Sequence, residues 1–187
     1  YQYTYRETYQ VLFSKVHRTM FWVFSAQGAM DVVGTVLWPI FLYRLFHGSL
    51  VRVGINASLV IGVTIILQIL IGYVIDRWNG KALLRFGITC YLLGLFLKAF
   101  VSSFTQVFFV GVYHNFALIL MQTPMDAIMY TRAAQAGHYI DEFTVLRELA
   151  IAFGRASMLT LCFFMISSFG FASGFVLAGC ATLVLNL

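Results

Sequence analysis

The chain has 187 residues, of which 61% are hydrophobic and only 10% are charged, with a mean hydropathy of +0.87. Soluble domains carry about 25% charged residues, so this chain lacks the polar surface to coat a water-soluble globule, and lipid must be its main solvent. The net charge of +5 lies mostly at the ends of apolar runs, which indicates membrane topology and argues against a nucleic-acid partner.

Residues 1–19 carry an apolar stripe at helical spacing. Tyr5, Tyr9 and Leu12 lie on this stripe, whereas most charged side chains of the segment lie off it. The pattern predicts a short amphipathic helix at the cytoplasmic membrane interface, which we interpret as a linker into the apolar residues 20–187. Because the chain begins without Met and ends inside an apolar run, we expect a part of a longer protein, with a natural half-length protein as the alternative.

The apolar part of the chain contains six candidate membrane-spanning segments, since a spanning helix needs about 20 apolar residues. We therefore predict an all-α, polytopic membrane protein with six transmembrane helices. The segments cover about residues 20–45, 53–75, 83–103, 106–130, 143–168 and 171–187.

The connections between these segments alternate in charge. Three cations lie toward the second side of the predicted membrane, and one of them, Lys98, is expected to extend its ammonium group to the interface. Under the positive-inside rule the richer side is cytoplasmic, which predicts a multi-pass protein of the cytoplasmic membrane with a cytoplasmic N-terminus. The cations of the richer side are Arg6, Lys15, Arg18, Arg77, Lys81, Arg85 and Arg132.

The turn between the second and third segments has the spacing Gly-x-x-x-Asp-Arg-x-Asn-Gly-Lys over residues 72–81. It resembles the cytoplasmic loop signature of the major facilitator superfamily, roughly Gly-x-Leu-Ala-Asp-Arg-x-Gly-Arg-Lys. In that family the signature lies between the second and third helices of each six-helix half, which is its position here. The matching residues are Gly72, Asp76, Arg77 and Lys81.

Two residues of the turn depart from the signature. Asn79 stands where the family has Gly, and Gly80 stands where it has Arg. Asn is the next-best residue for a left-handed turn, so the first departure is mild, whereas the second removes one cation from the loop. Gly72 is expected to allow two helix backbones to approach closely, as small residues do in membranes.

The resemblance implies one six-helix half of a secondary active transporter, most like a C-terminal half, that moves a small solute by alternating access. Its partners would then be the lipid bilayer, the other half and an unknown small-molecule substrate. A homodimeric carrier and a non-transporting scaffold or receptor remain as alternatives. The sequence contains no constellation typical of an enzyme and no motif typical of a cofactor site.

The first predicted helix carries a polar face formed by Gln27, Asp31 and Trp38. A charge inside a bilayer costs about 2.5–3.5 kcal/mol on insertion scales, so Asp31 near mid-membrane needs a reason. It either faces a cavity as a proton or substrate site, or it is hydrogen-bonded into the bundle.

The fourth predicted helix carries a polar stripe with His114, Gln122 and Asp126. We assign His114 and Gln122 to a candidate cavity, although a packed or solvated histidine is the simpler interpretation of His114. Pro124 lies within the same helix, as Pro39 lies within the first, and each of these helices also contains an acid. This correspondence suggests an inverted repeat of three helices.

The fifth predicted helix places two more charges within the apolar part of the chain. Glu148 and Arg155 are seven residues apart and share one face, about 10 Å apart along the helix. We predict a network that joins them to Asp126 near the cytoplasmic side. It acts either as a gate that forms in one state only or as a permanent contact between the fourth and fifth helices.

Overall fold

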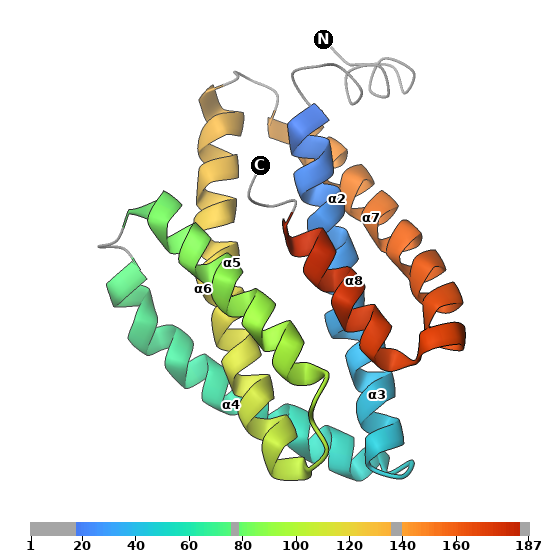
Figure 1. Cartoon of the computed structure of the whole chain (residues 1–187). Helices are drawn as coiled ribbons and strands as arrows, with labels where there is room; N and C mark the ends of the chain where they lie inside the picture. Colours follow the sequence, from blue (N-terminus) through green and yellow to red (C-terminus); the bar gives the residue numbers. More distant parts are fainter. Residues whose placement is uncertain (1–17, 76–78, 136–139, 184–187) are drawn as a thin grey trace.

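The computed structural model describes residues 18–75, 79–135 and 140–183, which form a bundle of helices with no strand among these residues (Figure 1). The all-α fold is thereby confirmed. The predicted amphipathic segment 1–19 lies almost entirely outside the described residues. In chain order the helical elements are α2 (Arg18–Val32), the π-helical turn η1 (Val33–Leu37), α3 (Trp38–Leu45), α4 (Leu50–Ile75), α5 (Gly80–Lys98), α6 (Phe104–Gln135), α7 (Ile140–Phe169) and α8 (Phe171–Leu183).

The described part of the chain contains five helical segments that are long and apolar enough to cross a membrane. The sixth predicted segment is represented by α8, which has 13 residues. At 1.5 Å per residue such a helix is about 20 Å long, shorter than a hydrocarbon core of about 30 Å. The five spans are Met20–Leu45, Leu50–Leu70, Gly80–Lys98, Phe104–Thr131 and Thr144–Ser168.

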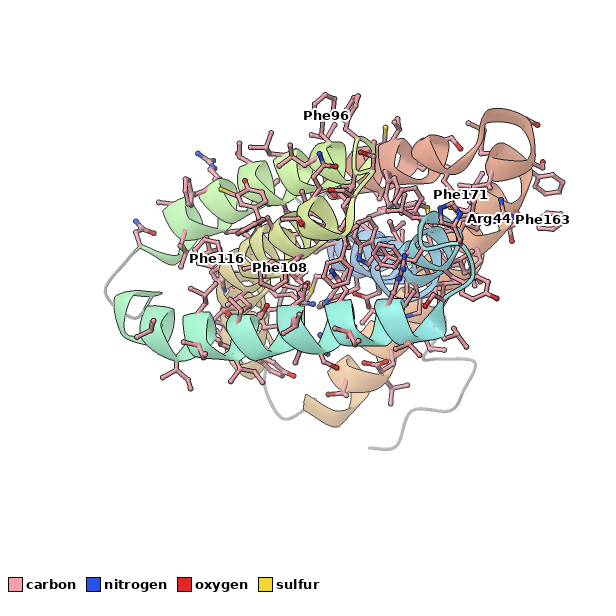
Figure 2. All side chains as sticks on the ribbon, turned by 90° about the horizontal axis from the view of Figure 1, so that it is seen from below. Arg44, Phe96, Phe108, Phe116, Phe163 and Phe171 are labelled. Atoms are coloured by element: carbon pink, nitrogen blue, oxygen red, sulfur yellow. The ribbon has the colours of Figure 1, made fainter. Side chains whose placement is uncertain are left out.

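The outside of the bundle is apolar, as expected for a surface in lipid. Phe96 is 62% exposed and Phe163 is 74% exposed, and both rings lie at the periphery of the bundle in Figure 2. Such a surface is far too apolar for a water-soluble monomer, since large exposed apolar patches mark protein or membrane contacts. The multi-pass membrane character is therefore supported by both length and surface chemistry.

The helices run up and down across the bundle. α2 begins, α6 ends and α7 begins near one end, which is uppermost in Figure 1, whereas α3, α5 and the start of α6 meet at the opposite end. The most extensive contacts join α2 to α7 and α5 to α6, and α4 packs mainly on α6. α8 fills the space between α2, α5 and α7.

The helix contacts of the first three apolar segments resemble those of the last three, as in an inverted repeat. If the first three apolar segments are matched in order to the last three, the contact of α2 with α7 corresponds to that of α6 with α4. In the same way the contact of α2 with α8 corresponds to that of α6 with α5. The correspondence is incomplete, because α7 packs on α8 whereas α4 makes no comparable contact with α5 among the described residues.

Two glycines bring α2 and α7 into backbone contact. A Cβ atom built on Gly28 would overlap the backbone carbonyl of Ile151, and one on Gly154 would overlap that of Ser25. Small residues permit this approach in lipid, where close van der Waals packing drives helix association. The crossing of α2 and α7 is therefore fixed backbone to backbone.

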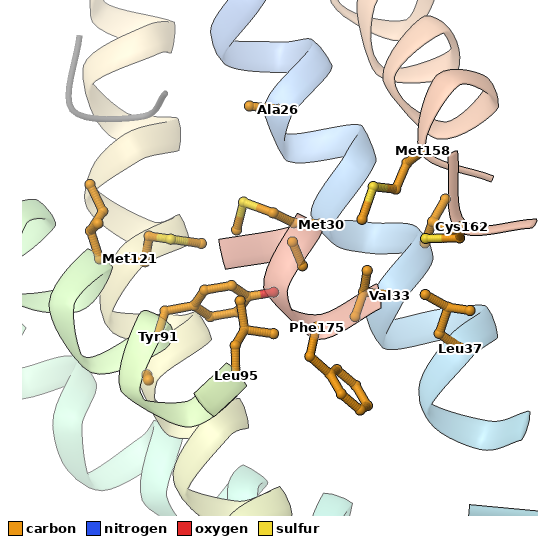
Figure 3. Packing of buried hydrophobic residues seen from close by; sticks show 14 of the residues in the cluster. Ala26, Met30, Val33, Leu37, Tyr91, Leu95, Met121, Met158, Cys162 and Phe175 are labelled. Atoms are coloured by element: carbon orange, nitrogen blue, oxygen red, sulfur yellow. The ribbon is translucent and has the colours of Figure 1, made fainter. Parts of the chain in front are cut away.

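The core lies where α2, α5, α6, α7 and α8 meet. Figure 3 shows Tyr91 and Leu95 of α5 facing Phe175 of α8 and the turn at Val33. Several methionines fill the remaining space, as unbranched thioethers readily do in irregular gaps. They include Met30, Met121, Met125 and Met158.

The first spanning helix changes its winding at η1. The Trp38 N–H donates to the Val33 carbonyl, five residues back, and the Thr35 hydroxyl donates to the Asp31 carbonyl at 2.7 Å. Pro39 lies in the first turn of α3 and has no N–H to donate, so it cannot continue the preceding hydrogen-bond ladder. Pro39 thus directly follows a π turn, a feature frequent at functional sites.

Candidate functional site

A cavity of about 350 Å³ lies between the first spanning helix and helices α4, α5 and α6. This volume is within the range of small-molecule sites, about 300–1,000 Å³. η1 and Pro39 form one wall, so the changed winding of this helix borders the cavity directly. The polar residues of the lining are Asp31, Thr35, Asn56, Tyr91, Lys98, His114 and Asn115.

Three of the five predicted cavity residues line this space, namely Asp31, Trp38 and His114. Gln27 and Gln122 do not, and their assignment to the cavity is corrected. Each lies about one turn beyond the last lining residue of its helix, at the level where methionine side chains fill the core. Gln27 is buried there and its Oε1 has no hydrogen-bond partner in the described part of the chain.

His114 is packed into the wall between α5 and α6. Its ring centroid lies 4.5 Å from that of Tyr91, and a Cβ atom on Gly94 would come within 2.8 Å of its Nδ1. The absence of a side chain at Gly94 therefore makes room for the imidazole. His114 is 4% exposed, and its buried Nδ1 has no hydrogen-bond partner among the described residues.

Lys98 is buried against the cavity, which corrects the expectation that it extends to the interface. Its side chain is 3% exposed, and Nζ lies 4.5 Å from the centroid of the Trp38 ring. Within the described ranges it forms no salt bridge and no hydrogen bond. The physical reason is its register, because Lys98 follows Tyr91 and Gly94 on the inward face of α5.

Asp31 joins the cavity to α7. Its carboxylate accepts a hydrogen bond from Arg155 at 3.0 Å, and the two side chains are 27% and 51% exposed. The predicted grouping of Arg155 with Asp126 and Glu148 is therefore corrected. The reason lies in the glycine crossing, because Arg155 directly follows Gly154 and is thereby placed opposite Asp31.

Asp126 and Glu148 instead meet a residue that the sequence analysis did not select. Arg147 lies 3.4 Å from the Asp126 carboxylate and 3.7 Å from that of Glu148. Its guanidinium also lies over the Phe24 ring, 5.5 Å from the centroid, so one cation links α2, α6 and α7. This network lies about two helical turns along α7 from Arg155.

The loop signature is only partly described by the structure. Asp76 and Arg77 lie outside the described residues. Asn79 has φ −65° and ψ 116°, an extended conformation and not a left-handed one. Its side-chain oxygen instead accepts from the Lys81 N–H at 3.1 Å, which makes it the N-cap of α5, a position that favours Asn. Among the described residues nothing lies within 4 Å of a Cβ atom on Gly72, so its expected close contact is not formed within this chain.

Sequence reasoning missed Lys98, Asn56 and Arg147. Asn56 is 2% exposed and donates from Nδ2 to the Phe104 carbonyl at 3.4 Å, which joins α4 to the start of α6. A lone amide within a long apolar run is a signal that could have identified it, because buried polar groups need partners. For Lys98 the signal is its helical spacing from Gly94 and Tyr91.

No three His, Cys, Asp or Glu side chains in the described part of the chain are grouped as metal ligands would be. The site therefore offers hydrogen-bonding and charged groups around a mostly apolar space. We find no match to this chain among models of protein families, among curated proteins or among solved structures.

Proposed function

We propose that this chain is one half of a secondary active transporter of the major facilitator type, moving a small solute by alternating access. The observation that carries the proposal is a cavity of small-molecule size inside a multi-pass bundle, lined by Asp31, Lys98 and His114. Ionisable groups within a membrane bundle are costly and typically mark a substrate or ion pathway.

Two further observations support this proposal. The helix neighbours correspond as in an inverted repeat, an arrangement that many transporters use to build a site near mid-membrane. The spacing of Gly72, Asp76, Arg77 and Lys81 resembles the family's loop signature. In this proposal the N-terminus is cytoplasmic, and the second half packs beside the first, with lipid around both.

Asp31 is the proposed coupling residue, because it contacts the cavity and α7 at once. Its ionised carboxylate holds Arg155 at 3.0 Å across the crossing of α2 and α7. Protonation removes the negative charge that attracts the guanidinium, so the Coulombic part of the pair is lost. Proton binding at Asp31 would thereby change how strongly α7 is held against the cavity wall.

The test is solute uptake by the full-length protein in proteoliposomes under an imposed proton gradient, with a library of small solutes. We expect gradient-driven accumulation of at least one solute, and we expect Asp31→Asn to remove its pH dependence. The matched control is Phe163→Leu on the lipid-exposed face of α7, which should leave uptake unchanged.

Two results would count against the proposal. If the purified protein accumulates no solute from the library, a scaffold or receptor becomes the better interpretation. If Asp31→Asn transports with an unchanged pH profile, the chain remains a transporter, but the proton role of Asp31 is wrong.

A further inference from the structure

We infer that the cavity binds a small organic monoanion, a carboxylate on a compact apolar body, with Lys98 as its counter-ion. This inference rests on the proposed function, because it names the substrate class of the same cavity.

Lys98 is a buried cation without an anionic partner. It is 3% exposed, and its Nζ lies over the Trp38 ring, 4.5 Å from the centroid. A cation–π contact recovers only part of the free energy that burial of an unpaired ammonium costs. The ring alone therefore does not offset the burial, and an anion entering the cavity would.

The charged residues that line the cavity provide no counter-ion for Lys98. Asp31 is the one carboxylate in the lining, and it is already bonded to Arg155 at 3.0 Å. No salt bridge joins Asp31 to Lys98 in the described part of the chain. The cavity thus contains one cation to be neutralised, which matches a single carboxylate and disfavours a doubly charged phosphate ester.

The remaining surface defines the rest of the ligand. Asn115 also lines the cavity and can donate from its amide to the second carboxylate oxygen, whereas the buried Nδ1 of His114 faces Gly94 within the wall. Trp38, Leu42 and Val60 supply apolar wall. At about 350 Å³ the cavity accommodates a compact aromatic or branched acid.

The experiment measures ligand-dependent thermal stabilisation of the full-length protein in nanodiscs. The probes are acetate, isovalerate, benzoate and indole-3-acetate, each compared with its primary amide and its matched primary amine at 10 mM. We expect at least one carboxylate to raise the unfolding midpoint while its amide and amine do not. Lys98→Met should abolish the shift, Lys98→Arg should retain part of it, and Arg52→Gln, an exposed cation of α4, should behave as wild type.

A second measurement does not depend on any ligand. Lys98→Met removes an unpaired buried charge at nearly constant volume, so the variant should unfold at a higher temperature than wild type when no probe is present. A lower midpoint would show that a partner for Lys98 exists without ligand, and the inference would then be wrong.

The remaining outcomes separate this inference from the proposed function. Carboxylate binding that depends on Lys98, without uptake of that carboxylate in proteoliposomes, supports the inference and contradicts transport. Uptake of neutral or cationic solutes that persists in Lys98→Met supports transport and contradicts the carboxylate inference. Phosphatidylglycerol nanodiscs could raise the unfolding midpoint without any added probe. If Lys98→Met removes that rise, the site binds a lipid headgroup and the inference is wrong. Equal stabilisation by a carboxylate and its amide would also overturn the inference.

Discussion

The crossing of α2 with α7 and that of α4 with α6, which would correspond in an inverted repeat, differ in how closely their backbones approach. At the first, Gly28 and Gly154 each face backbone atoms of the other helix. At the second, a Cβ atom on Gly111 would meet only the Val60 side chain, at 3.0 Å. Buried residues make up 67% of the most apolar stretch of Met20–Leu45 but 11% of that of Leu50–Leu70.

This difference separates a fixed part of the bundle from an adjustable one. A backbone contact has no side chain that can change rotamer, so α2 and α7 must move together. α4 is held mainly by side chains on one face, and regions with few buried contacts open most readily. The cavity lies on the α4 side, where a wall can shift without breaking the core.

The largest effect is expected from adding a side chain at the glycine contact between α2 and α7. Gly154→Ala forces α7 away from Ser25, and we expect a loss of about 3 kcal/mol in the free energy of unfolding, at the upper end for overpacking. The control is Gly62→Ala on α4, where nothing lies within 4 Å in the described structure and a change below about 1 kcal/mol is expected. Reversible unfolding in mixed micelles measures both, and equal effects would remove the distinction between the crossings.

A smaller effect is expected from the ion pair of the same crossing. Asp31 and Arg155 are partly exposed, so a double-mutant cycle with Asp31→Asn and Arg155→Gln should give a coupling of about 1–2 kcal/mol, below that of a fully buried pair. Asp126→Asn combined with Arg155→Gln is the control and should be additive within about 0.5 kcal/mol. Strong coupling in the control pair would restore the gate network predicted from sequence.

A larger side chain in the cavity tests whether the α4 side of the bundle can adjust. Ala57 lines the cavity from α4, and Ala57→Leu should change the free energy of unfolding by less than about 1 kcal/mol, because the new side chain enters open space. The initial rate of solute uptake should nevertheless fall at least tenfold. A variant that loses stability but keeps its transport rate would indicate that the cavity is not the substrate path.

The smallest effect is expected from the second crossing itself. Gly111→Ala requires only a small displacement of Val60, so we expect a loss of about 0.5 kcal/mol. In a Val60→Ala background the same Gly111→Ala change should cost no stability, because the contacting methyl groups are absent. A loss as large as that of Gly154→Ala, with no rescue, would show that α4 is held as rigidly as α7.

The spanning helices could be predicted from sequence because hydropathy sums over many residues and single errors cancel. The second span was expected at 53–75 and is found at Leu50–Ile75. The ends were less predictable, since the fourth helix continues to Gln135, beyond its apolar part at residue 130. Helix ends depend on capping and local hydrogen bonds, as at Asn79, which hydropathy does not report.

The pairing of charges was harder to predict, because spacing along a helix gives its faces but not its neighbours. Asp126 and Arg155 have suitable faces, yet the contact at Gly28 and Gly154 brings Arg155 to Asp31 instead. The adjacency of Gly154 and Arg155 was visible in the sequence and could have indicated a charge at a helix contact. Lys98 was misplaced for a similar reason, since its distance from the helix end suggested an interface and its register placed it inward.

The π turn at Val33–Leu37 also bears on which changes in chain length this helix can tolerate. A π turn contains one residue more than the α-helical turn that it replaces. Elsewhere in a spanning helix, the loss of one residue rotates all that follows by about 100° and moves every contact to another face. At η1 the same deletion would restore regular α winding and leave the faces of α2 and α3 as they are. This turn is therefore the one position in the first span where the chain can shorten by a residue while both Asp31 and Trp38 keep their orientation.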